Sequence, residues 1–201
     1  YVTLTKTGID KLGKYVKYLS DFEGLHGHSI SIKSRKNSSN TKKLVQVCNE
    51  KNIEAHHIES FSQAADKINF HFEASDQISE TIDAIHKLGC SAGICINPET
   101  PVNMVNNFLE KTEQIMIMTI NPGWGGQTMM FEQLNKVREL RKTIDIHKYK
   151  TQIEIDGGVK IENIGLCAEA GADTLVCGSS VYNSEDKPEN NLTRLRSAIP
   201  E

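Results

Sequence analysis

Short apolar runs alternate with longer amphipathic segments along the chain. The short runs are rich in β-branched and aliphatic residues, which is typical of buried β-strands. Eight such runs are present: Val2–Leu4, Ser29–Ile32, Ile53–Ile58, Lys67–Phe72, Ser91–Ile96, Ile115–Ile120, Gln152–Ile155 and Thr174–Cys177.

Between several of these runs, apolar residues recur with the period of an α-helix. The predicted helices are Ile78–Leu88, Phe131–Ile144 and Ile161–Ala170. Their predicted buried positions are Ile78, Ile82, Ile85 and Leu88; Leu134, Val137, Leu140 and Ile144; and Ile164, Cys167 and Ala168. Gly171 is expected to end the last helix, since glycine commonly follows a helical C-terminus.

Strands that alternate with helices predict a parallel sheet with right-handed crossovers. Eight strands without a GxGxxG turn after the first favour closure into a barrel over an open doubly wound sheet. We therefore predict an α/β fold, a (β/α)₈ TIM barrel, as a single domain over residues 1–201. The stretch from His56 to His71 must hold a strand end, a helix and the next strand, which predicts a shortened third βα unit.

Composition and charge narrow the function classes. The net charge is −3 and no Lys/Arg cluster dominates a segment, which argues against a nucleic-acid partner. The densest basic stretch, from Lys33 to Lys43, is interpreted as a loop and a helix face. No apolar run reaches membrane-span length, so we expect no membrane partner and a cytoplasmic location. The five cysteines form no CxxC pair and are expected to be reduced and mostly buried.

Three glycine-rich turns follow the last three predicted strands. They are Asn121–Gln127, Asp156–Val159 and Gly178–Ser180. Glycines let backbone N–H groups approach an anion closely, and barrels of this class commonly bind phosphate after their last two strands. Because neither a Walker A motif nor a dinucleotide fingerprint is present, the expected ligand is the phosphate of a small molecule.

These motifs resemble those of the ribulose-phosphate 3-epimerases. The similarity is carried by MTINPGWGGQ from Met118, IEIDGGV from Ile153, and AEAGAD followed by VCGS from Ala168. HFEA from His71 and AGICINPETP from Ala92 fit the middle strands. The resemblance is close from Asn69 to Asp186 and loose before Asn69.

The resemblance implies an isomerase acting on a ketopentose 5-phosphate. It implies inversion at C3 through an enediolate, stabilised by a divalent metal such as Zn, Fe, Mn or Co. On this basis Asp156 is the expected acid/base and a metal ligand, with His28 and His56 as further metal ligands. His56 also belongs to the implied substrate contacts, the others being Met118, Gly123, Trp124, Gly125, Gly126, Gly157, Gly158, Gly178 and Ser179.

The chain departs from the family pattern at its second strand. If His28 occupies the family's histidine position, the aspartate position holds Ile30; if His26 does, it holds His28. One carboxylate of the expected acid/base pair is therefore missing, and the replacement would be His28 or an acid among Glu54, Glu59 and Glu73. Lys6 stands near the family's first-strand serine and is a candidate substrate contact.

Three hypotheses follow from these observations. The first is a 3-epimerase of ribulose 5-phosphate and xylulose 5-phosphate, or of a related ketose phosphate such as allulose 6-phosphate. The second is a non-catalytic phosphosugar-binding protein that has lost the second carboxylate. The third is an aldol-type or decarboxylase reaction with a Schiff-base lysine at Lys6. A homo-oligomer is compatible with each of them.

Overall fold

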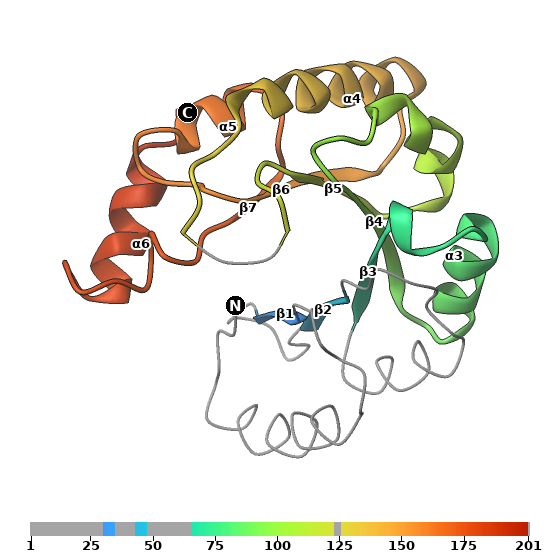
Figure 1. The fold of residues 1–201 in the computed structure, drawn as a ribbon, viewed down its shortest axis with the longest axis horizontal. Coiled ribbons are helices and arrows are strands. Elements are labelled where there is room, and N and C mark those ends of the chain that lie inside the picture. Colours follow the sequence, from blue (N-terminus) through green and yellow to red (C-terminus); the bar gives the residue numbers. More distant parts are fainter. Residues whose placement is uncertain (1–29, 35–42, 48–65, 123–125, 201) are drawn as a thin grey trace. The chain divides into compact units, whose positions relative to one another are not determined.

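The chain forms two compact units in the computed structural model, which describes residues 30–34, 43–47, 66–122 and 126–200 (Figure 1). The first unit comprises Tyr1–Phe70 and Ala74–Ser91, and the second comprises His71–Glu73 and Ala92–Glu201. The predicted strands Val2–Leu4 and Ile53–Ile58 lie outside the described residues, as does most of the predicted third βα unit.

Strands β1 (Ile30–Ser34) and β2 (Lys43–Val47) are antiparallel, whereas β2 runs parallel to β3 (Lys67–His71). The prediction of an all-parallel sheet is therefore wrong at β1 and β2. The segment from residue 35 to residue 42 is too short for a parallel crossover, which needs about a dozen residues or more. The interpretation of Lys43 as part of a loop or helix face is also wrong, because it begins β2.

Helix α3 (Ile78–Lys87) follows a single turn of 3₁₀ helix, η1 (Phe72–Ala74). Ile78, Ile82 and Ile85 are buried, as their spacing predicted. Leu88 is 37% exposed, which contradicts the prediction that it would share this face. The helix ends at Lys87, so Leu88 is its C-cap rather than part of the last turn, and the chain changes direction at Gly89, which has φ +76°.

Apart from Ser91, the second unit contains four parallel strands in chain order: β4 (Ser91–Ile96), β5 (Gln114–Met118), β6 (Gln152–Asp156) and β7 (Thr174–Val176). The connections hold η2 (Val102–Lys111), η3 (Phe131–Gln133), α4 (Leu134–His147) and α5 (Ile164–Glu169), and α6 (Pro188–Ser197) follows β7. The βαβ pattern predicted for this half of the chain is confirmed. The predicted strand ending at Ile120 stops at Met118, and the predicted helix from Ile161 begins at Ile164.

Successive side chains of β4, β5 and β6 alternate between two chemically distinct faces. One face consists of isoleucines, all fully buried: Ile94, Ile96, Ile115, Ile117, Ile153 and Ile155. The opposite face carries Cys95, Met116, Met118, Glu154 and Asp156. Helix α4 lies along one side of this layer (Figure 1) and buries Leu134, Val137, Leu140 and Ile144, as predicted. The sheet therefore has an apolar face suited to helix packing and a second face that carries carboxylates.

Arg141 links α4 to the turn that precedes β7. Its Nε donates to the Gly171 carbonyl at 3.0 Å, and its guanidinium pairs with Asp173. The Asp173 carboxylate also accepts a 2.7 Å hydrogen bond from the Ile153 amide. Gly171 has φ +106° and lies just after α5, which confirms its predicted role as a helix stop.

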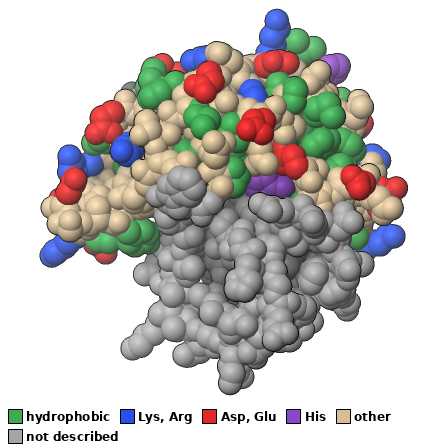
Figure 2. Space-filling view, in the orientation of Figure 1, with side chains coloured by type: hydrophobic (Ala, Val, Ile, Leu, Met, Phe, Trp, Pro, Cys, Tyr) green, Lys and Arg blue, Asp and Glu red, His purple; other side chains and the backbone are tan. Residues whose placement is uncertain are grey.

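The surface of the described residues carries both signs of charge. On the face in Figure 2, basic and acidic side chains are interspersed rather than segregated. No helix within the described ranges is long and apolar enough to cross a membrane. The four cysteines in this part of the chain are in the thiol form, with Cys95 and Cys167 buried as predicted and Cys177 partly exposed. Burial, with a smaller effect from Cys177, raises the pKa of Cys167 to about 11.

Candidate functional site

Asp156 and Met118 occupy adjacent positions at the carboxyl ends of β6 and β5. The two residues are register partners and therefore lie on the same face of the sheet. Met118 is 5% exposed, whereas Asp156 is partly exposed. The structure thus brings together the predicted acid/base and the predicted pocket methionine at the strand edge where barrel enzymes place their chemistry.

Buried Thr119 fixes the backbone that carries Asp156. Its amide donates to the Asp156 carbonyl at 2.9 Å, and its hydroxyl lies 3.1 Å from the same oxygen and 2.5 Å from the Gly157 carbonyl. Thr119 is 0% exposed, so these contacts are shielded from water. The backbone from Asp156 to Gly157 is therefore held against the end of β5.

The glycines after Asp156 are required by packing. Gly157 has φ +128°, and a Cβ there would lie 2.5 Å from Ile120 Cγ1. Gly158 has φ +64°, and a Cβ there would lie 2.6 Å from the Met129 amide nitrogen and 2.9 Å from the Gln127 carbonyl oxygen. From the sequence motifs, both glycines were predicted to contact phosphate. The structure gives each a steric role, and their contact with phosphate stays a prediction.

Asn163 and Ser180 join this turn to the segments around it. Asn163 Nδ2 donates to the Gly158 carbonyl at 2.9 Å, and its Oδ1 accepts from the Lys160 amide at 2.7 Å. The Ser180 hydroxyl donates to the Val159 carbonyl at 2.8 Å. These bonds explain why α5 begins only at Ile164, since Asn163 is engaged with the preceding turn.

The third glycine turn begins at Gly178, which is buried. The amides of Val181 and Tyr182 both donate to the Gly178 carbonyl at 2.9 Å, so the chain turns sharply after β7. Buried Asn191 on α6 stabilises the rest of this loop through its side-chain amide, which donates to the Val181 carbonyl, the Asn183 side chain and the Asp186 carbonyl at 3.1, 3.1 and 3.2 Å. Ser179 stays exposed at the outer side of the turn.

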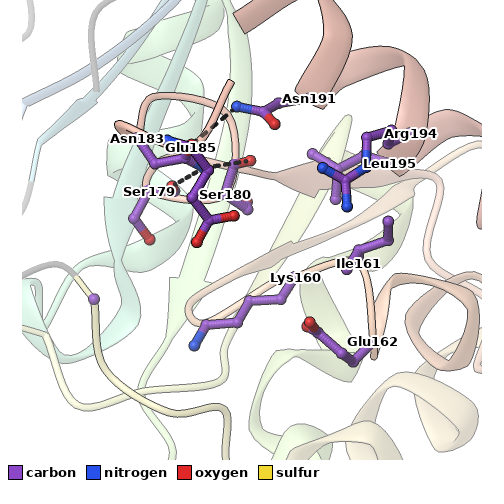
Figure 3. A pocket seen from close by; sticks show the side chains of 11 residues that line it. Lys160, Ile161, Glu162, Ser179, Ser180, Asn183, Glu185, Asn191, Arg194 and Leu195 are labelled. Atoms are coloured by element: carbon purple, nitrogen blue, oxygen red, sulfur yellow. Dashed lines mark hydrogen bonds between the residues drawn. The ribbon is translucent and has the colours of Figure 1, made fainter. Parts of the chain in front are cut away.

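Gly126 and Ser179 line a common pocket of about 400 Å³ (Figure 3). Four charged side chains that the sequence analysis did not identify also line it, namely Lys160, Glu162, Glu185 and Arg194. Lys160 directly follows the Asp156–Val159 turn, and this position in the sequence could have identified it as a residue of the site. Arg194 could not have been found in the same way, because its place depends on how α6 folds back toward the strand ends.

A second polar cluster surrounds Glu73 and Lys136, next to β3 and β4. Lys136 Nζ donates to the carbonyls of Asn97, Pro98 and Thr100 at 3.2, 2.6 and 2.7 Å. Glu73 accepts from the Asn97 amide at 3.0 Å and from the Thr100 hydroxyl, and His71 Nδ1 lies 3.4 Å from its other oxygen. Lys136 therefore binds carbonyl groups of the loop that follows β4, and Glu73 accepts hydrogen bonds from donors of the same loop.

We expect this cluster to make stability depend on pH in the acid range. Burial alone would raise the pKa of Glu73, but hydrogen bonds from His71, Thr100 and Asn97 outweigh it and lower the pKa to about 2. The ionised carboxylate thus stabilises the fold above its ordinary pKa of 4.5, and this contribution is lost as the pH falls toward 2. Glu73→Gln should reduce the free energy of unfolding by about 1–2 kcal/mol near pH 6, after allowance for solvent screening.

Urea denaturation of both proteins from pH 6 to pH 2.5 measures this effect. The difference between wild type and Glu73→Gln should shrink as the pH falls. Thr100→Val removes one of the hydrogen bonds and should give a weaker trend in the same direction. A difference that stays constant over the whole range would contradict the prediction.

The remaining predicted site residues lie outside the described ranges. They are Lys6, His28, His56, Gly123, Trp124 and Gly125. Within the described ranges, no three His, Cys, Asp or Glu side chains are grouped so that they could hold a metal ion. Of the predicted metal ligands, Asp156 alone is described, and its carboxylate at a strand end is chemically suited to that role.

Comparison with solved structures identifies the fold. A 3-hexulose-6-phosphate synthase superposes with a TM-score of 0.55 at 19% identity, covering 73% of this chain and 68% of that one. A KGPDC from Streptococcus mutans gives 0.55 at 14% identity, covering 72% and 66%. With the βαβ order of the second unit, these likenesses show that the chain has the (β/α)₈ barrel fold.

Comparison of sequences identifies the family. Residues 43–182 match the profile of the ribulose-phosphate 3 epimerase family. The ribulose-phosphate 3-epimerase of Escherichia coli K12 is 42% identical over 119 residues, which cover 59% of this chain and 53% of that protein. That of Serratia marcescens is 41% identical over 130 residues, covering 64% and 62%. The chain belongs to the ribulose-phosphate 3-epimerase family, and its matched part spans somewhat more than half the length of these relatives.

Proposed function

We propose that the protein is an epimerase that interconverts D-ribulose 5-phosphate and D-xylulose 5-phosphate by inversion at C3. The observation that carries the proposal is the Asp156 carboxylate, held at the end of β6 beside Met118 in a chain of this family. Gly126 and Ser179 line a pocket formed by the loops after β5 and β7, and a substrate phosphate would bind there. The single barrel domain over residues 1–201 is part of the same proposal.

Asp156 acts as acid and base toward the C3 proton in this proposal. Its carboxylate removes the proton α to the carbonyl and gives an enediolate, and return of a proton to the opposite side of C3 yields the epimer. Thr119 maintains the geometry, because its hydrogen bonds fix the peptide that follows Asp156. The candidates for the group that delivers the second proton are His28, Glu54, Glu59 and Glu73, and of these Glu73 lies within the described residues.

A divalent cation is also part of the proposal, with His28, His56 and Asp156 as its ligands. When bound, it would supply positive charge to the oxygens of the enediolate. Two histidines and one carboxylate form a recognised ligand set for such ions.

A coupled assay with ribulose 5-phosphate tests the proposal. We expect xylulose 5-phosphate to form when Zn²⁺, Fe²⁺, Mn²⁺ or Co²⁺ is supplied. In D₂O, deuterium should enter the C3 position of the recovered sugar, because the proton is lost and regained there. The absence of both turnover and exchange with every metal would overturn the proposal. Running the same assay with allulose 6-phosphate tests the related-ketose alternative.

A non-catalytic phosphosugar-binding protein is the second candidate. It is favoured by the absence of a carboxylate at both Ile30 and His28, the two positions open to the family's second aspartate. It predicts that ribulose 5-phosphate raises the melting temperature without being converted. Under this alternative, Ile30→Asp or His28→Asp should restore measurable turnover.

A further inference from the structure

Gly126 differs from Gly157 and Gly158 in the space available for a side chain at its position. Its φ is +82°, and no atom of the described residues lies within 4 Å of where a Cβ would stand. At Gly157 and Gly158, by contrast, neighbouring atoms fill that space. Gly126 is exposed and lines the pocket, so a ligand there can approach the open side of its backbone.

Lys160 contributes an ammonium group to the same pocket. Its backbone is held by the hydrogen bond to Asn163, while its exposed side chain extends across the pocket wall (Figure 3). In that view the Lys160 amine and the Ser179 hydroxyl are directed toward the same side of the pocket. An open backbone turn, a hydroxyl and a cation on a long aliphatic stem are the donors that suit a phosphate.

The other charges of the pocket do not neutralise this ammonium. Glu162 and Glu185 also line it, but within the described residues neither carboxylate forms an ion pair with Lys160. Arg194, the second cation, acts on Asp186 and helps to lower the pKa of that carboxyl after the larger effects of its hydrogen bonds with Asn190 and Lys187. Of the two cations that line this pocket, Lys160 is therefore the one whose charge interacts less with other groups of the protein.

We propose that Lys160 binds the phosphate group of the substrate in the pocket that Gly126 and Ser179 line. This inference rests on the proposed function for the identity of the sugar, but the phosphate contact itself is independent of turnover. It assigns Lys160 to binding and specificity: the residue favours a dianionic phosphate ester over the unphosphorylated ketose and takes no part in proton transfer.

Titration calorimetry with inorganic phosphate and with ribulose 5-phosphate tests the assignment. Lys160→Met should weaken the binding of both ligands about tenfold, which is the effect of losing one charge-assisted hydrogen bond to an anion. Lys160→Arg should stay within about threefold of wild type, because it keeps the charge. Lys142→Met, which removes an exposed lysine of α4, is the matched control and should bind both ligands as wild type does. Melting temperatures establish that each variant is folded.

The outcomes separate this inference from the proposed function. If Lys160→Met weakens phosphate binding while the wild type shows no epimerisation, the Lys160 assignment stands and the proposed function fails. If the wild type turns over and Lys160→Met binds phosphate equally well, the assignment is overturned alone. If the wild type binds neither phosphate nor ribulose 5-phosphate, both are overturned. In an active enzyme, KM should rise about tenfold in Lys160→Met with kcat within about twofold, and an equal loss in kcat would contradict a binding role.

Discussion

Asp156→Asn is expected to lower kcat/KM for ribulose 5-phosphate by about 10³-fold, the middle of the range for loss of a positioned acid/base. Asparagine keeps the size of the side chain but cannot accept the C3 proton. The backbone around it should be unchanged, because Thr119 bonds to the carbonyls of Asp156 and Gly157 rather than to the carboxylate. The variant should therefore fold normally and lose catalytic activity.

Three measurements on Asp156→Asn distinguish lost chemistry from lost structure. Its melting temperature should stay close to that of wild type, and inorganic phosphate should bind as before, since the proposed phosphate pocket is lined by other side chains. Exchange of the C3 proton in D₂O should fall together with turnover. Asp83→Asn, an exposed aspartate of α3, serves as the matched control and should retain activity. Turnover within tenfold of wild type in Asp156→Asn would remove this residue from the acid/base role.

Asp156 and Met118 were predicted as site residues from the family resemblance, and strand alternation explains why the structure brings them together. Asp156 ends a run whose alternation places Glu154 and Asp156 on one face, and the same alternation places Met118 beside it. Both positions depend only on the strands that carry them and on parallel pairing. The burial of Leu134, Val137 and Leu140 was predictable for the same reason, because one regular period fixes all three.

The parts that the sequence did not predict depend on longer-range geometry. Lys43–Val47 forms a strand whose five residues alternate only weakly in polarity, and its antiparallel pairing follows from a short connection rather than from composition. Lys160 and Arg194 meet in one pocket only because α6 returns toward the strand ends. The two histidines that would complete a metal site lie outside the described residues, so their prediction stands as the resemblance left it.

Glycine motifs illustrate why a pattern alone cannot separate binding from packing. The sequence interpreted Gly126, Gly157 and Gly158 alike, as places where a backbone approaches phosphate. Among the described residues, space remains open beside Gly126 and is filled beside the other two. The two causes make opposite predictions for substitution: an alanine at a packed glycine should damage the fold, whereas an alanine at an open one should cost mainly backbone strain.

Gly158→Ala should consequently reduce the free energy of unfolding by about 3 kcal/mol or more. A left-handed backbone costs a residue with a Cβ about 1–2 kcal/mol. The new methyl group would also stand 2.6 Å from the Met129 amide nitrogen and 2.9 Å from the Gln127 carbonyl oxygen. Both are backbone atoms, so no side chain can rotate away, and the segment from Gln127 to Met129 must shift. Overpacking of this kind adds about 1–3 kcal/mol.

Gly89→Ala measures the free-energy cost of a left-handed backbone without the cost of a steric clash. Gly89 has φ +76°, close to the +64° of Gly158, but in the part of the chain that the structure describes no atom lies within 4 Å of the place where its new methyl group would stand. It should therefore lose only about 1–2 kcal/mol. Urea denaturation of the two variants at the same pH measures the difference, which is the steric contribution of the turn after Asp156. Equal losses in the two variants would mean that the 127–129 segment yields freely, and a segment that yields freely could not hold the Asp156 turn in one geometry for proton transfer.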